Sequence, residues 1–227
     1  MYQPTGDEVS YIEAYKKMRR GVLYMLLALL LLLIIGSILL LVVFSIAVIQ
    51  FRGPVIIPEL PEGVPGGEEL VGNVIVLIIL IIALLVPVAL YFLGLWGNFV
   101  PGVRRLGELN VEFRTASRLV HLGFFWGVLL VIIGVLTAPI LIGIPILIIG
   151  AILVLIGYIG LIILGFKLHN YEGDGLYLAA AITFIIGIVI SVLQIIGFIL
   201  LYVALGHSIK RREALAQTPP SAPPTPV

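Results

Sequence analysis

The 227-residue chain contains no cysteine, and this absence removes several classes of chemistry. Disulfide bonds, thiolate metal sites, iron–sulfur clusters and cysteine nucleophiles all need the missing side chain. Charged residues are also scarce, at 11% of the chain, whereas roughly 25% is typical of soluble domains. Together with a mean hydropathy of +1.25, this scarcity excludes a soluble fold.

Four long stretches contain no Asp, Glu, Lys or Arg at all. They are Gly21–Phe51, Leu70–Val103, Leu119–Phe166 and Gly175–Ile209. Each is longer than the roughly 20 apolar residues that a helix needs to cross a bilayer core. The apolar residues are continuous rather than alternating, which favours helices over the strands of a membrane barrel. The sequence therefore predicts an all-α, polytopic transmembrane helix bundle.

We divide the chain into three parts. Residues 1–20 are expected to form a cytoplasmic tail with a short interfacial helix, because Ser10–Glu13 has the spacing of a capping box and basic residues follow it. Residues 21–209 form the transmembrane domain. Residues 210–227 combine a basic stop with a disordered, proline-rich tail. The predicted spans are residues 22–49, 71–95, 119–136, 140–166 and 176–205.

The connections between spans carry most of the charge. Arg52–Glu69 is rich in proline, glycine and glutamate and is expected to be an irregular loop. Gly97–Arg118 is a basic loop whose end, Leu109–Arg118, has the composition of a short surface helix. Thr137–Pro139 or Gly143–Pro145 provides the turn between the third and fourth spans.

The charge distribution predicts the orientation and also raises a conflict. Basic residues favour the cytoplasmic side, so the N-terminal cluster and the Gly97–Arg118 loop place the N-terminus in the cytoplasm. Five spans would then put Lys210–Arg212 outside. Six spans would remove the conflict if Leu176–Ile209 were a hairpin that breaks near Ser191–Gln194, with arms of about 17 residues at the lower limit for crossing. We take five spans as the prediction and keep six as the alternative.

Small residues form a regular stripe on the third and fourth predicted spans. Stripes of small residues let membrane helices approach closely, since lipid supplies no hydrophobic drive for association. The two spans are therefore expected to pack against each other or against another chain. The glycines that carry this prediction are Gly123, Gly127, Gly134, Gly143, Gly150 and Gly157.

No ionisable residue lies near the middle of a predicted span, which argues against a pump or a proton-coupled transporter. Gln194 is expected to form a hydrogen bond across helices, or alternatively to line a solute path. Pro87 should kink the second span. Arg104, Arg105, Lys210, Arg211 and Arg212 are expected to contact anionic lipid head groups. Because the basic residues are juxtamembrane, nucleic-acid binding has no support.

The segment Leu176–Arg212 carries a repeated aliphatic-Ile-Ile-Gly pattern that ends in a small-residue turn and a basic stop. This pattern resembles an uncharacterised family called domain of unknown function 996, over about residues 107–212. The resemblance implies an archaeal cell membrane and no assigned activity. It transfers no catalytic residue.

These features lead to two functional hypotheses. The first is a non-catalytic scaffold or accessory subunit, with the lipid bilayer, other membrane subunits or a second copy as partners. The second is a channel or uncoupled carrier for a small or apolar solute, in which Pro87 and Gln194 line a broken-helix path. A water-filled cavity at mid-depth would favour the second hypothesis. No catalytic, cofactor-binding or metal site is predicted, and no cofactor, because no acid, base or metal-ligand cluster is present in the sequence pattern.

Overall fold

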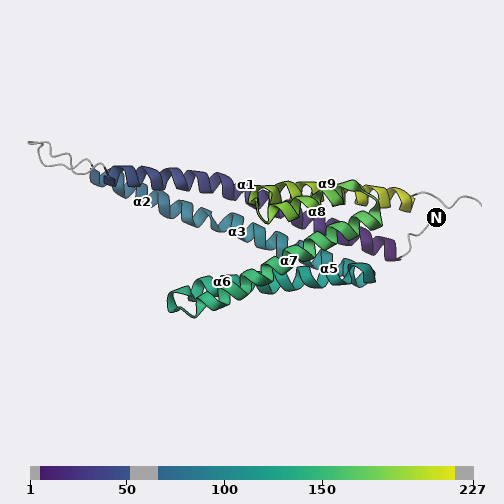
Figure 1. Ribbon diagram of the computed structural model, residues 1–227. Helices are drawn as coiled ribbons and strands as arrows, with labels where there is room; N and C mark the ends of the chain where they lie inside the picture. The colour runs from purple at the N-terminus through teal and green to yellow at the C-terminus, as the bar shows by residue number, and fades with distance from the viewer. Residues whose placement is uncertain (1–5, 52–65, 218–227) are drawn as a thin grey trace, which may run out of the picture. The chain divides into compact units, whose positions relative to one another are not determined.

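The computed structural model describes residues 6–51 and 66–217, and these residues form helices joined by short connections (Figure 1). The predicted all-α fold is confirmed for this part of the chain. Two π-helical segments, η1 Leu93–Phe99 and η2 Leu122–Gly127, and a 3-10 turn, η3 Ala138–Ile140, lie between α-helices. The α-helices are α1 Gly6–Phe51, α2 Gly66–Ala83, α3 Leu85–Phe92, α4 Val100–Leu109, α5 Val111–His121, α6 Val128–Thr137, α7 Gly143–Glu172, α8 Gly175–Gly187 and α9 Ser191–Gln217.

Five helical stretches are long and apolar enough to span a membrane, so the chain is a membrane protein. They are Glu8–Ser45, Val74–Leu109, Val111–Thr137, Gly143–Glu172 and Val192–Ala216. Most of the predicted acidic loop and the predicted disordered tail fall on residues 52–65 and 218–227, which lie outside the described residues.

The chain forms two compact units. Unit 1 contains the residues up to Leu26 and those from Leu93 onward, and unit 2 contains Leu27–Phe92. In unit 2, α2 ends at Ala83. In an unbroken helix the Ala83 carbonyl would accept a hydrogen bond from the N–H of residue 87, but Pro87 has no N–H. Large apolar side chains of unit 2 are exposed, so its surface is suited to lipid or to an apolar partner.

In unit 1 the first half of α1 is a core helix that begins at Gly6, in the segment where the sequence predicts a short interfacial helix. Tyr15 and Met18 are fully buried. α4 runs antiparallel beside this part of α1, with Gly102 against Met18 and Arg105 paired with Glu13 at 2.7 Å. The sequence did not indicate this burial because the helices that cover Tyr15 and Met18 are distant in the sequence.

α4 and α5 form a helical hairpin in Gly97–Arg118, where the sequence predicts a basic loop that ends in a short helix at Leu109–Arg118. α5 corresponds to the predicted helix, whereas α4 lies where only a loop was predicted. Asn110 separates the two helices with extended backbone angles (φ −139°, ψ 127°), and its side-chain oxygen accepts the N–H of Glu112 at 2.9 Å. Asparagine is favoured at helix N-termini for this reason. Leu106 and Phe113 are fully buried, so both helices belong to the core of unit 1.

α7 packs antiparallel against α5, η2 and α6 through backbone contacts at glycine. A Cβ on Gly123 would overlap the backbone of Gly157, and a Cβ on Gly150 would lie 2.7 Å from the backbone nitrogen of Val131. Glycine is the residue that permits this approach, and dispersion contacts between the backbones increase as a result. The structure places all six glycines of the predicted stripe in this hairpin: Gly123, Gly127, Gly134, Gly143, Gly150 and Gly157.

The prediction of one continuous fifth span over residues 176–205 is wrong. The helix breaks after Gly187, and α9 returns antiparallel to α8, with Gln194 Nε2 donating to the Gly187 carbonyl at 3.1 Å. α8 has 13 residues, which is about 20 Å of helix at about 1.5 Å per residue. This is shorter than the roughly 30 Å bilayer core. The chain therefore turns back within Leu176–Ile209, as the hairpin of the alternative does, but α8 does not supply a sixth span. The number of helices long enough to span a membrane is the predicted five, and the fifth is Val192–Ala216.

The hairpin brings the end of α9 to the start of α1. Lys16 and Glu213 pair at 2.7 Å, and the Arg19 guanidinium lies over the ring of Tyr202, 4.5 Å from its centroid. α9 also continues as a helix to Gln217, past the basic residues where the sequence predicts its end. The basic residues of α1, α4 and α9 therefore gather at one end of unit 1, and the conflict that five spans create is removed.

Candidate functional site: a buried polar cluster

The connection between α7 and α8 positions two acidic residues. Gly173 has a φ of 71°, in the left-handed region that favours glycine, and its N–H bonds the His169 carbonyl at 2.8 Å. Asp174 then begins α8, with its Oδ1 accepting the N–H of Leu176 at 2.9 Å. This short turn places Glu172 at the end of α7 and Asp174 at the start of α8.

Glu172 and Arg212 form an ion pair in which the carboxylate is buried and the guanidinium is partly buried. Arg212 Nη2 lies 2.6 Å and Nε lies 3.0 Å from Glu172 Oε1, and the two side chains are 13% and 5% exposed for Arg212 and Glu172. The hydroxyl of Tyr15 donates to the same oxygen at 2.8 Å. Three donors from α1 and α9 thus converge on one carboxylate oxygen of α7. Such hydrogen bonding is what allows an ion pair to remain charged away from water.

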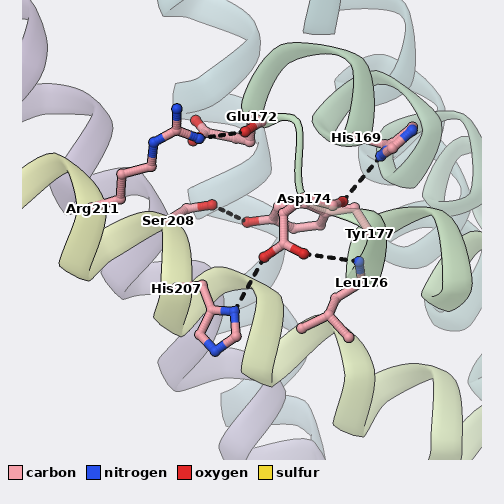
Figure 2. Close-up of polar contacts among 8 residues, drawn as sticks. All are labelled: His169, Glu172, Asp174, Leu176, Tyr177, His207, Ser208 and Arg211. Carbon is pink, nitrogen blue, oxygen red and sulfur yellow. Dashed lines mark hydrogen bonds and ion pairs between the residues drawn. The ribbon is translucent and has the colours of Figure 1, made fainter.

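Arg211 and three aromatic rings surround this pair. Arg211 Nη1 donates to the backbone carbonyl of Glu172 at 2.7 Å (Figure 2), which satisfies an acceptor that the end of α7 leaves free. The Arg212 guanidinium lies over the rings of Tyr11, Tyr15 and Tyr171, at 4.9, 5.4 and 5.4 Å from their centroids. Aromatic faces attract cations, so the rings add to the stability of the buried charge.

A second row of contacts joins α8 to α9 (Figure 2). The hydroxyl groups of Tyr177 and Ser208 are 2.8 Å apart, and both residues are buried. Asp174 Oδ2 lies 3.3 Å from His207 Nδ1, and the Asp174 carbonyl lies 3.0 Å from His169 Nδ1. We call the central residues the polar cluster: Tyr15, Glu172, Tyr177, Ser208, Arg211 and Arg212.

The chemistry of the polar cluster suits it to holding helices together. Glu172 Oε1 already accepts three hydrogen bonds, and Arg212 balances its charge, so the carboxylate is a poor general base. In the described part of the chain, no three His, Cys, Asp or Glu side chains gather closely enough to hold a metal ion. The polar cluster therefore fastens the ends of α1, α7, α8 and α9 to one another.

The predicted lipid-contact residues lie in different environments. Arg212 is turned into the polar cluster, so the prediction that it contacts lipid head groups is wrong. Arg211 bonds the end of α7 but remains exposed. Arg104 and Arg105 form surface ion pairs with acidic residues of unit 1. Lys210 is exposed beside the first half of α1.

Gln194 lies between helices, with both ends of its amide hydrogen-bonded. The hydroxyl of Tyr158 donates to Gln194 Oε1 at 3.0 Å, and Gln194 Nε2 donates to the Gly187 carbonyl. These contacts join α7, α8 and α9, which corresponds to the cross-helix role that the sequence predicts for Gln194.

Sequence reasoning missed the polar cluster, although one signal was available. Glu172 and Asp174 precede the charge-free stretch Gly175–Ile209, and basic residues follow it directly. A hairpin in that stretch brings its two ends together and pairs the charges. The contribution of Tyr15, 157 positions from Glu172, had no local signal.

Comparison with known proteins identifies a family but no activity. A family model described as "Protein of unknown function (DUF973)" matches residues 11–227. No curated protein and no solved structure matches the chain. The resemblance to domain of unknown function 996 is corrected by this match, because the matching family is a different one; that the family is uncharacterised is confirmed.

Proposed function

Since the chain belongs to the DUF973 family of unknown function, we propose its role from its structure: it is a non-catalytic scaffold or accessory subunit of a larger membrane complex. The unequal burial of its apolar helices carries the proposal. In the most apolar parts of Glu8–Ser45 and Val74–Leu109, 6% of the residues are buried within the chain. The corresponding share in Val192–Ala216 is 44%.

The two units differ in how much of their apolar surface is buried. Unit 1 is held by glycine backbone contacts and by the polar cluster. Unit 2 leaves side chains such as Leu40, Ile79 and Ile82 exposed at 69%, 59% and 60%. Helices that their own unit leaves uncovered can bury this area against the helices of another subunit, with lipid covering the remainder.

We also propose an orientation. The basic end of unit 1 lies in the cytoplasm, because positive residues favour that side of a membrane. Both the start of α1 and the end of α9 would then be cytoplasmic, and the membrane would be the cell membrane. The archaeal source that the earlier resemblance implied stays a prediction.

Gentle detergent extraction from native membranes tests the role directly. A photo-reactive amino acid placed at Ile79 of α2 should crosslink to a second polypeptide that co-purifies in stoichiometric amount. Ile152 of α7 is the matched control, since it is 55% exposed but belongs to unit 1; it should give lipid adducts. A particle containing this chain alone, with lipid adducts at both positions, would overturn the proposal. Solute flux through that particle in liposomes would then support the channel alternative.

A further inference from the structure

A basic pocket lies between the first half of α1 and the end of α9, within unit 1. Its volume is about 400 Å³. Four cationic side chains line it: Lys16, Arg19, Arg20 and Lys210. Leu23, Tyr202 and Ile209 supply an apolar wall.

The positive charge of the basic pocket is largely uncompensated. Its one acidic lining residue, Glu213, pairs with Lys16 at 2.7 Å. Among the side chains that the structure describes, no carboxylate lies within ion-pair distance of Arg19, Arg20 or Lys210. The three remaining cations therefore make the pocket attractive to an anion.

Arg19 is held in place by an aromatic ring, and at least one of its N–H donors has no hydrogen-bond partner in the described part of the chain. Its guanidinium stacks on Tyr202, and a Cβ on Gly206 would lie 3.3 Å from its Cζ, so glycine provides the room. Arg19 Nε is buried with no hydrogen-bond partner in the described part of the chain. A guanidinium fixed in this way presents planar donors that match phosphate oxygens.

The position of the basic pocket along α1 and α9, at the ends of their charge-free stretches, indicates the kind of anion. Arg20 is the last charged residue before the charge-free stretch Gly21–Phe51, and Lys210 is the first after Gly175–Ile209. Because α1 and α9 are antiparallel, both boundaries fall at the same level, with the apolar wall on the membrane side. A ligand that fits this position has a phosphate head group and an apolar tail.

We propose that the basic pocket binds the phosphate head group of an anionic membrane lipid. Basic pockets between membrane helices on the cytoplasmic side are suited to such head groups. The inference is independent of whether the protein is a subunit of a larger complex, because it rests on unit 1 alone.

Lipid binding to the purified full chain, counted by native mass spectrometry in a neutral detergent, tests the proposal. Phosphatidylglycerol should bind and phosphatidylcholine should not compete. The double variant Arg20→Gln/Lys210→Gln should bind phosphatidylglycerol about 30-fold more weakly, at about 1 kcal/mol for each cation near the surface. Lys17→Gln/Arg104→Gln removes the same charge from exposed positions that do not line the basic pocket, and it should bind normally.

Three results would overturn the proposal. Equal losses in the two double variants would indicate a diffuse field rather than a site. Inorganic phosphate that displaces phosphatidylglycerol at equal concentration would indicate a free-anion site. If the first double variant fails to fold, the exposed single substitution Lys210→Glu keeps the test decisive: unchanged phosphatidylglycerol binding in this variant would also refute the proposal.

Discussion

Breaking the ion pair between Glu172 and Arg212 should destabilise the protein far more than breaking a surface pair. Arg212→Met is expected to lower the free energy of unfolding by about 3–5 kcal/mol, the range for removing one partner of a buried pair. The structure sets this magnitude because the side chains of Glu172 and Arg212 are 5% and 13% exposed, so water has little access to the carboxylate that would lose the guanidinium. Glu172 Oε1 would also lose two of its three donors. Methionine keeps an unbranched apolar stem, so the loss reports mainly on charge.

Two further variants separate charge from packing. Lys16 and Glu213 also pair at 2.7 Å, but their side chains are 53% and 40% exposed, so Lys16→Met should cost less than about 1 kcal/mol. The double variant Glu172→Met/Arg212→Met removes both buried charges and should recover most of the stability, because no unpaired charge remains.

Unfolding of the purified protein in mild detergent by added sodium dodecyl sulfate, followed by circular dichroism, measures these free energies. A cost for Arg212→Met that is no larger than the cost for Lys16→Met would refute the reasoning, since the carboxylate would then be solvated. A double variant as unstable as Arg212→Met would assign the loss to packing.

The other predictions concern the glycine contacts, Gln194 and the topology. Gly123→Ala should lower the free energy of unfolding by about 1–3 kcal/mol, because its Cβ would overlap the Gly157 backbone. Gly36→Ala, which has nothing within 4 Å of its Cβ, should stabilise α1 by up to about 1 kcal/mol. The same detergent titration measures both variants, and equal effects would contradict a close contact at Gly123. Gln194→Leu removes the hydrogen bonds to Tyr158 and Gly187 and should lower the free energy of unfolding by about 1 kcal/mol. Adding Tyr158→Phe to this variant should have little further effect. Additive losses in free energy would show that the two residues do not interact. Glu8→Cys and Ala216→Cys, introduced separately into this cysteine-free chain, should react with an impermeant maleimide from the same side of sealed vesicles; labelling from opposite sides would refute the α8–α9 hairpin.

The membrane character and the helical class follow from the sequence alone. In lipid the backbone can satisfy its hydrogen bonds only in helices or closed barrels, and the continuous apolar stretches favour helices whatever the tertiary arrangement. The glycine spacing likewise marks one face of a helix, and Gly123 and Gly157 meet in the structure as that face predicts. Both signals are local: composition and spacing within single segments carry them.

The hairpin in Leu176–Ile209 and the polar cluster were decided by tertiary structure. No proline marks the break after Gly187, and the turn depends on the close packing of α9, where a Cβ on Gly187 would lie 2.8 Å from Gln194 Cγ. Ser191–Gln194, where the sequence analysis places the break of the alternative hairpin, has the spacing of a capping box, and α9 begins at Ser191. The sequence does not decide between this start signal and a single continuous helix, because the apolar stretch Gly175–Ile209 is long enough to form one.

The buried charges show the same division. The sequence shows Arg212 as a basic residue at a membrane boundary, where lipid head groups are the expected partners. Its actual partner, Glu172, lies 40 positions away in the sequence. The two residues meet because the chain reverses direction between α8 and α9. Tyr15 joins them from α1, 157 positions from Glu172. Composition and periodicity decide whether a residue enters the membrane, but the pairing of charges depends on helix directions, which only the packed bundle determines.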